Sequence, residues 1–181
     1  MKGIVFTEFL ELVEKKFGLA MVDRIIEESN LSSQGVYTSV GTYEFSEMLS
    51  LLNNLSKNTN IPTNHLLEIY AEHFFTTLQK SYPFLLEEYS DPITLLSSIE
   101  NHIHVEVKKL YPDAELPTFE VLEKTEYKLV MTYKSSRAMY SFGLGLMHKT
   151  FEHFNKKAKI EYDKLKEDGT EVKFLIEMTN G

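Results

Sequence analysis

Three hydrogen-bond donors stand at every second position of the stretch MTYKSSRAMYSFGLGL, residues 131–146, namely Tyr133, Ser135 and Arg137. In an extended segment alternate side chains point to the same side, so the three can converge on one target. The planar guanidinium of arginine matches the two oxygens of a carboxylate or phosphate. The spacing therefore indicates a site for an anionic group. The alternative is the polar edge of a strand that runs into a helix.

Two histidines in the stretch SSIENHIHVEVKKLYP, residues 97–112, are candidate metal ligands. On a strand, His102 and His104 would share one face and could bind the same ion. On a helix they diverge by roughly 200°, which rules this out. A helix is favoured by apolar residues at helical spacing, which are Leu96, Ile99, Ile103, Val107 and Leu110. The two histidines flank this stripe at equal angles, so periodicity does not choose between them, and a structural or surface role for either stays open.

Composition and charge limit the classes of function. The chain has 181 residues, 43% of them hydrophobic, which is enough for one domain with a sizeable core or two packed halves. A net charge of −8 argues against nucleic acid and anionic membranes as main partners. The absence of cysteine excludes disulfides and cysteine-based metal sites. Because neither a signal peptide nor a long apolar run is present, we expect a soluble cytoplasmic protein.

The chain up to about Pro112 has apolar residues at helical spacing. The first two helices are indicated by Phe6, Phe9, Leu10 and Val13, and then by Met21, Ile25 and Ile26. A glycine-containing loop is predicted over 32–43. Further helices are predicted near residues 43–58, 62–80 and 83–89. Another is predicted from Asp91 and Pro92 to about Leu110, with Asp91 as its N-cap.

After Pro112 the apolar period shifts towards two, which is typical of half-buried strands. Strands are predicted near residues 121–122, 127–133, 158–162 and 172–178. Tyr127 opens the second strand, a helix from about residue 137 to 155 follows it, and the turn KEDGTE (166–171) joins the last two strands as a hairpin. The predicted fold class is α+β. An N-terminal helical subdomain packs on a C-terminal antiparallel sheet with a crossing helix.

Three segments together resemble the haem–nitric oxide/oxygen binding (H-NOX) family, which includes bacterial gas sensors and the haem domain of soluble guanylate cyclase. They are the start MKGIVFTEFLELVEKKFG, the run HVEVKKLYPDAELPTF (104–119) and the motif Tyr133-x-Ser135-x-Arg137. The motif is the family's most specific mark, and the resemblance covers essentially the whole chain. It implies a single domain over residues 1–181, with a helical part over about 1–65, a haem-binding α/β part over about 66–181, and the haem between them.

The resemblance implies one haem b per chain, with ferrous iron. In the family the three donors of the motif bind the haem propionates, which are carboxylates that are costly to bury unpaired. The axial ligand lies seven residues before the tyrosine of a Tyr-Pro pair, which selects His104 over His102 as the ligand of the iron. Pro117, thirteen residues after His104, resembles a family proline that presses on the macrocycle. An unremarkable proline at the start of a strand is the alternative.

On the opposite, distal side of the haem the resemblance implies an apolar lining. The matching residues are Val5, Phe9, Phe74, Leu78, Phe142 and Leu146, and an ordinary core position is the alternative for each. Family members that hold O2 stably have a distal tyrosine that donates to it, and the matching residue here is Phe142, which has no donor. Tyr140 lies about 200° away around a helix and should point elsewhere. We therefore expect a sensor of NO, and weakly of CO, that excludes O2.

Gly143 and Gly145 form the run GLGL with their neighbours. The run is no phosphate loop, because no third glycine follows. Inside a helix each glycine costs about 1 kcal/mol relative to alanine. The pair therefore indicates close approach to a flat ligand, a point of bending, or close packing against another helix.

Nothing in the sequence resembles a nucleophile with its base or an activated water site, so we expect a binding switch and not an enzyme. The resemblance implies a separate signalling partner, typically a histidine kinase and sometimes a cyclic-di-GMP enzyme. Two other functions stay open. One is a haem-free adaptor or carrier of an apolar ligand, and the other is a metal-dependent hydrolase that uses histidines and carboxylates.

Overall fold

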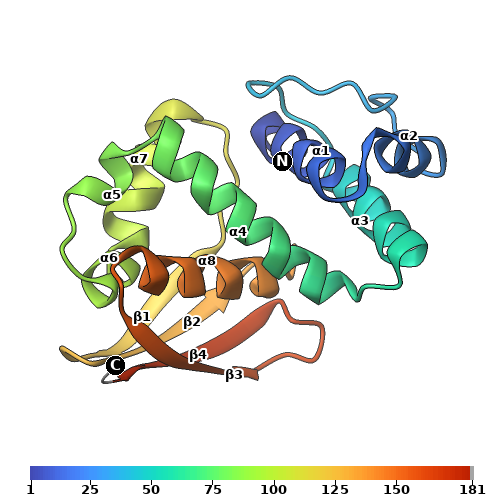
Figure 1. Ribbon diagram of the computed structural model, residues 1–181. Helices are drawn as coiled ribbons and strands as arrows, with labels where there is room; N and C mark the ends of the chain where they lie inside the picture. Colours follow the sequence, from blue (N-terminus) through green and yellow to red (C-terminus); the bar gives the residue numbers. More distant parts are fainter. Residues whose placement is uncertain (180–181) are drawn as a thin grey trace.

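The structure is a computed structural model that describes residues 1–179. The C-terminal part is an antiparallel sheet of four strands, in the order β1 (Thr118–Lys124), β2 (Lys128–Lys134), β4 (Glu171–Thr179) and β3 (Lys157–Lys164). Helix α8 (Tyr140–His153) lies across one face of the sheet (Figure 1). Among residues 1–179, no helix combines the length and apolarity needed to cross a membrane.

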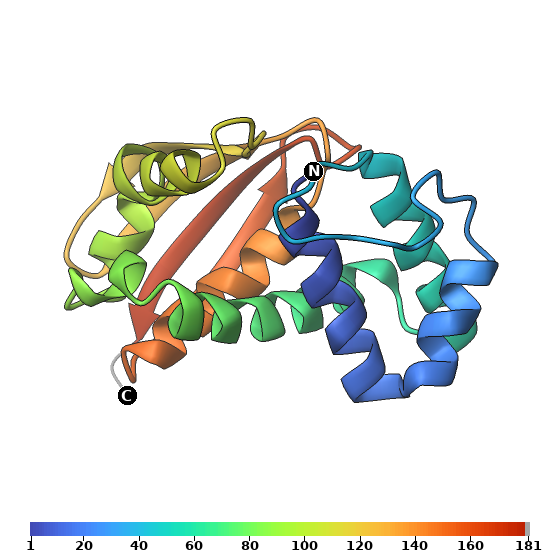
Figure 2. The same cartoon turned by 90° about the horizontal axis from the view of Figure 1, so that it is seen from above.

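The N-terminal part is helical. Its elements are α1 (Gly3–Phe17), α2 (Leu19–Glu27), α3 (Phe45–Thr59), α4 (Thr63–Ser81) and the short α5 (Phe84–Glu87). Helices α1, α2 and α3 form a group beside the sheet domain, and α4 runs from this group alongside α8 (Figure 2). The arrangement confirms the predicted α+β class, and the predicted helices are present with small shifts of their ends.

The loop predicted over 32–43 covers the first turn of α1. Its backbone carbonyls accept from the amides that a helix leaves unpaired at its start, Gly41 from Gly3 (2.8 Å) and Ser39 from Ile4 (2.9 Å). A Cβ on Gly3 would lie 1.7 Å from the carbonyl oxygen of Thr38. Glycine is therefore required at this position by the close approach of the loop.

The same loop is held to α3 by Glu47, whose side chain is buried. Its carboxylate accepts from the hydroxyls of Ser32 (2.6 Å), Ser33 and Tyr37 (2.7 Å) and from the backbone amide of Ser33 (3.2 Å). Burial alone raises the pKa of this carboxyl, but the hydrogen bonds outweigh burial, and the pKa of Glu47 lies below its ordinary value of 4.5.

We expect Glu47→Gln to lower the free energy of unfolding by about 2 kcal/mol at pH 7, because hydrogen bonds to a charged acceptor become neutral ones. A carboxyl with a lowered pKa stabilises the folded state above its unfolded pKa and loses this contribution as the pH falls. The difference from wild type should therefore shrink below about pH 4.5. Urea unfolding at several pH values measures it. Glu44→Gln, at an exposed carboxyl of the same segment, is the control, and an equal loss there would contradict the prediction.

The helix predicted from Asp91 to Leu110 begins as expected but is not continuous. Asp91 caps it by accepting from the amide of Thr94 (2.8 Å). It is divided into α6 (Pro92–Ser97), a π-helical segment η1 (Ile99–Ile103) and α7 (His104–Leu110). The hydroxyls of Ser97 and Ser98 both donate to the carbonyl of Thr94 (2.9 and 2.8 Å), so they compete with the backbone ladder at the break.

The sheet follows the predicted alternation, with one correction at its start. Leu129, Met131 and Tyr133 are buried along β2 and pair with residues of β4, whereas Tyr127 lies before the strand and is 53% exposed. The first position of the predicted strand is therefore wrong. The turn over 166–171 joins β3 and β4 as predicted, with Gly169 at a φ of 77°.

Two hydrophobic clusters make up the interior. One joins α1, α2, α3 and the first half of α4, and the other joins α5, α6, α8, the sheet and the second half of α4. Tyr70 of α4 belongs to the first cluster and Phe75, five residues on, to the second. Helix α4 therefore contributes to both clusters and connects the helical group with the sheet domain.

Candidate functional site

The three donors of the motif lie where β2 gives way to α8. Tyr133 is in the strand, but Ser135 and Arg137 are in the following turn, so the expectation of one extended segment is wrong. The hydroxyl of Ser135 accepts from the amide of Arg137 (3.2 Å), and Ala138 has a left-handed φ of 50°. Because this turn delays the helix, α8 begins at Tyr140 and not at residue 137.

The turn nevertheless brings the three side chains together. Burial raises the pKa of the Tyr133 phenol, and Ser135, the backbone at Met139 and the charge of Arg137 offset part of this rise. The phenol therefore stays protonated at neutral pH and can donate a hydrogen bond. Ser135 and Arg137 thus both act on the surroundings of the Tyr133 phenol, and each of the three side chains carries a hydrogen-bond donor that an anionic ligand could use.

The guanidinium of Arg137 holds a carboxylate in this structure. It donates to the carboxylate of Glu115 (2.5 Å) and to the backbone carbonyl of the same residue (2.9 Å). The central carbon of the guanidinium lies over the ring of Phe45 in α3, 5.6 Å from its centroid. The side chain of Arg137 is only 16% exposed, whereas that of Glu115 is 83% exposed. A largely buried cation thus pairs with a carboxylate that is mostly exposed to solvent.

His104 opens α7, directly after the π-helical segment. Its Nδ1 lies 2.9 Å from a carboxylate oxygen of Glu100, and its side chain is 14% exposed. Burial lowers the pKa of His104, and the neighbouring carboxylate offsets this only in part. The neutral imidazole, with its hydrogen on Nδ1, leaves the lone pair of Nε2 available to a metal.

His102 has a different environment, although periodicity does not separate the two histidines. Its Nδ1 lies 2.6 Å from the hydroxyl of Tyr89, and its Nε2 lies 3.7 Å from a carboxylate oxygen of Glu88. Both ring nitrogens therefore have partners on the α5 side of the helix. His104 instead faces Phe119 of β1, with ring centroids 6.1 Å apart.

Pro117 lies just before β1. This position agrees both with a proline at the start of a strand and with one that presses on a macrocycle. It borders a small cavity of about 80 Å³. The cavity is lined by Glu100, His104, Val105, Lys108, Leu116, Pro117 and Thr118. The structure therefore places Pro117 and His104 at one cavity, on the same side of the molecule.

The six apolar residues predicted for the distal side are divided between the two hydrophobic clusters. Val5, Phe9, Phe74 and Phe142 belong to the N-terminal cluster, and Leu78 and Leu146 to the C-terminal one. Phe9 is fully buried, whereas the other five are only partly buried although they come from helices that pack together. Phe74 and Phe142 contact each other across α4 and α8, with centroids 5.6 Å apart.

Tyr70 is a residue of this region that the sequence reasoning missed. It is fully buried, and its ring lies 5.1 Å from that of Phe142 and 5.8 Å from that of Phe74. Its hydroxyl donates to the backbone carbonyl of Val5 (2.6 Å). The signal was present in the spacing, because residue 70 lies one helical turn before residue 74. Glu100, one turn before His104, was missed although its spacing gave the same signal.

The two glycines of α8 have different surroundings. A Cβ on Gly145 would lie 2.6 Å from that of Ala71 and 2.9 Å from the carbonyl oxygen of Glu68, so close packing against α4 requires this glycine. A Cβ on Gly143 would meet only the ring edge of Phe119, at 3.9 Å. Tyr140 packs on Tyr162 of β3, with centroids 5.3 Å apart, away from the distal residues.

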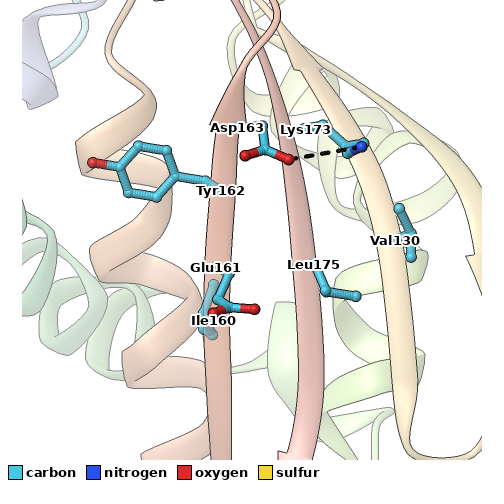
Figure 3. A pocket seen from close by; sticks show the side chains of 7 residues that line it. All are labelled: Val130, Ile160, Glu161, Tyr162, Asp163, Lys173 and Leu175. Atoms are coloured by element: carbon cyan, nitrogen blue, oxygen red, sulfur yellow. Dashed lines mark ion pairs between the residues drawn. The ribbon is translucent and has the colours of Figure 1, made fainter.

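Two other features of the surface have the shape or residue types of a site, and neither includes a predicted site residue. A groove of about 640 Å³ lies on the sheet, where Asp163 and Lys173 face each other across β3 and β4 (Figure 3). Within residues 1–179, Glu8, Glu11 and His73 form a group with the spacing of metal ligands. Glu8 is already bonded to Thr77 and to His73 (3.2 Å), and Glu11 is exposed. The group therefore joins α1 to α4.

Comparison with known proteins shows which family the chain is similar to. A family model described as Haem-NO-binding matches residues 2–162. The chain is similar to the Fe(II) unliganded H-NOX protein from K. algicida, with 67% identity, a TM-score of 0.98, and coverage of 100% of this chain and 98% of that chain. A comparison with curated proteins gives no match.

Two further solved structures are similar to the chain. The H-NOX protein from S. oneidensis in the Fe(II)NO ligation state has 25% identity and a TM-score of 0.91, with coverage of 99% of this chain and 100% of that chain. The IWP-051-bound H-NOX from Shewanella woodyi in the Fe(II)CO ligation state has 36% identity and a TM-score of 0.83, with coverage of 99% and 95%.

Proposed function

The chain belongs to the Haem-NO-binding (H-NOX) family, and from this premise we propose that it is a haem-based sensor of nitric oxide. It binds NO, and more weakly CO, at ferrous haem, and it regulates a separate signalling protein by a change of conformation. The observation that carries the proposal is the similarity, over nearly the whole of both chains, to the K. algicida protein in its Fe(II) state. The similar H-NOX structures in the Fe(II)NO and Fe(II)CO ligation states support NO and CO as the gases that bind.

The residues of this chain fit a haem. His104 offers Nε2 to the iron, because Nδ1 is engaged by Glu100. Tyr133, Ser135 and Arg137 form a cluster of donors suited to the propionates, and Arg137 already pairs with a carboxylate. Apolar side chains from α1, α4 and α8 retain partial exposure, as residues that line a ligand site do. When bound, ferrous haem supplies the coordination chemistry for diatomic gases.

We place the site within a single domain over residues 1–181, between a helical part over about 1–65 and an α/β part over about 66–181. The two hydrophobic clusters support two parts, although the change from one cluster to the other lies within α4, between Tyr70 and Phe75. The protein acts by binding and not by catalysis. The partner is a histidine kinase or a cyclic-di-GMP enzyme, which the protein recognises differently in its two ligand states.

A visible spectrum of the purified protein is the direct test. An intense Soret band from ferrous haem that shifts when NO is added supports the sensor. A colourless protein that cannot be reconstituted with haem would refute it. In that case stoichiometric zinc would indicate the hydrolase, and the absence of any metal would indicate the adaptor or apolar-ligand carrier.

Arg137→Ala should release haem about tenfold faster than wild type, because the loss of a charge-assisted hydrogen bond to a carboxylate costs at least about 1.4 kcal/mol. Tyr133→Phe and Ser135→Ala should have smaller effects, since each removes a neutral donor. Transfer of haem to an excess of apomyoglobin measures the rate. The other arginine, Arg24, is exposed on α2 and provides the matched control, Arg24→Ala. An unchanged rate in the Arg137 variant would count against the propionate assignment.

A further inference from the structure

Glu100 is the residue with the most specific contact to the proposed iron ligand. Its Oε1 lies 2.9 Å from Nδ1 of His104, one helical turn further along the chain. The same oxygen accepts from the backbone amide of Phe119 in β1, also at 2.9 Å. The carboxylate is thus held from two sides, by the helix that carries His104 and by the first strand of the sheet.

We propose that Glu100 is a positioning residue for the axial ligand, which holds the imidazole of His104 through Nδ1–H and strengthens its bond to the iron through Nε2. The inference rests on the proposed function, because it takes His104 as the ligand. An ionised carboxylate only accepts hydrogen bonds, so the hydrogen between the two residues belongs to Nδ1. A hydrogen bond of this kind fixes the ring orientation of a metal-bound histidine and raises the basicity of its other nitrogen.

The local fold supports a specific role for this pair. Glu100 lies in the π-helical segment η1, and π-turns occur frequently at functional sites. The side chain of Glu100 is 33% exposed, against 14% for His104, so the carboxylate lies at the border of the site with the charge partly solvated. The amide of Phe119 helps to keep the carboxylate in place, because it donates to the same oxygen that lies next to Nδ1, and a carboxylate oxygen can accept two hydrogen bonds.

The consequence for sensing concerns the stability of the bond between His104 and the iron. A sensor that responds when this bond breaks depends on how strongly the histidine is held. With Glu100 in place, His104 is a stronger ligand, and the switch responds to NO but not to weaker ligands. Without the carboxylate, His104 should be released from the iron about tenfold more readily. This lies within the range found when hydrogen-bond partners of metal-binding residues are removed.

The test uses the full chain with haem bound. Glu100→Gln keeps the size of the side chain and an acceptor oxygen but removes the charge. We expect the iron–histidine stretching band in the resonance Raman spectrum to move to lower frequency, and the five-coordinate NO complex to form about tenfold faster. Glu106→Gln, in the helix α7 that His104 opens but paired with Lys109, is the matched control and should leave both readouts unchanged. A purely structural role for Glu100 would change the melting temperature without moving the band.

A second measurement compares two added ligands in one variant, so that the stability of α7, the helix of His104, is the same in both samples. In His104→Gly, imidazole can donate N–H to Glu100, whereas 1-methylimidazole cannot. We expect imidazole to give the higher iron–nitrogen stretching frequency, and this difference to become smaller when Glu100→Gln is added. Equal differences with and without the carboxylate would overturn the inference.

The outcomes separate the inference from the proposed function. A wild-type protein without haem would refute the sensor assignment itself. A His104→Gly variant that keeps its iron–histidine band would show that another residue binds the iron, and would overturn the inference, which takes His104 as the ligand. A wild-type band that is lost in His104→Gly but stays unshifted in Glu100→Gln would leave the sensor standing and refute only the role of Glu100.

Discussion

His104→Gly is expected to lose its haem unless imidazole is supplied, and with imidazole to behave as the NO-bound state without any NO. The resemblance to the family implies that His104 loses its bond to the iron when NO binds on the other side. The variant breaks the same covalent connection while the cofactor stays in place. The measurement is the effect on the partner, for instance inhibition of autophosphorylation if the partner is a kinase, compared with the effect of NO on wild type.

The physical reason lies in the contacts at the end of α7. Tyr111 and Asp113 follow this helix directly. The ammonium of Lys2 pairs with Asp113 (3.0 Å), and the hydroxyl of Thr42 donates to the same carboxylate (2.8 Å). Lys2 also lies over the ring of Tyr111, 5.7 Å from its centroid. We therefore expect a helix released from the iron to change these contacts with Lys2, at the start of α1, and with Thr42, in the loop before α3.

His102→Gly is the matched control, two residues away. Its imidazole is bonded to Tyr89 and should have no contact with the iron, so haem content and the response to NO should stay close to those of wild type. If this variant lost the axial ligand, or if His104→Gly kept it, the assignment of the ligand would be wrong. The effect on the partner is bounded by the coupling free energy between the two sites, typically about 1–3 kcal/mol.

Much of the fold is predictable because buried side chains recur along the sequence with the period of a strand or a helix. Leu129, Met131 and Tyr133 alternate in the sequence and are buried in the sheet, and Asp91 followed by Pro92 begins a helix as expected. In such segments the residue types, the hydrogen bonding and the apolar pattern agree with one another. The motif with Ser135 was likewise visible from residue types and spacing alone.

The features that the sequence does not predict are of two kinds. In some, side chains compete with the backbone for a hydrogen bond, and in others the contact joins residues far apart in the chain. At the break before η1, Ser97 and Ser98 both donate to one carbonyl and so compete with the backbone ladder, which the residue types alone do not reveal. The late start of α8 depends on the left-handed conformation of Ala138, which alanine rarely adopts. The hydrogen bond of Glu100 to Phe119 and that of Tyr70 to Val5 join residues far apart in the chain.

The second large effect concerns the choice of gas. We expect the visible spectrum of the ferrous protein to change with NO and CO and to stay unchanged with O2. Stable O2 binding needs a hydrogen-bond donor to the polarised ligand, and Phe142 has none. Tyr70 is the phenol closest to this phenylalanine among the described aromatic contacts, but its hydroxyl already donates to Val5 (2.6 Å). Turning it towards a ligand would break this hydrogen bond, at a cost of about 0.5–1.5 kcal/mol.

Two substitutions test this argument from opposite sides. Phe142→Tyr places a donor at the distal position and should produce an O2-dependent change in the spectrum that wild type lacks. Tyr70→Phe removes the nearby hydroxyl and should leave the responses to all three gases unchanged, while it lowers stability through the lost hydrogen bond to Val5. A wild-type spectrum that changes with O2, and no longer does so in Tyr70→Phe, would show that Tyr70 is the donor and that the distal side is not apolar in function.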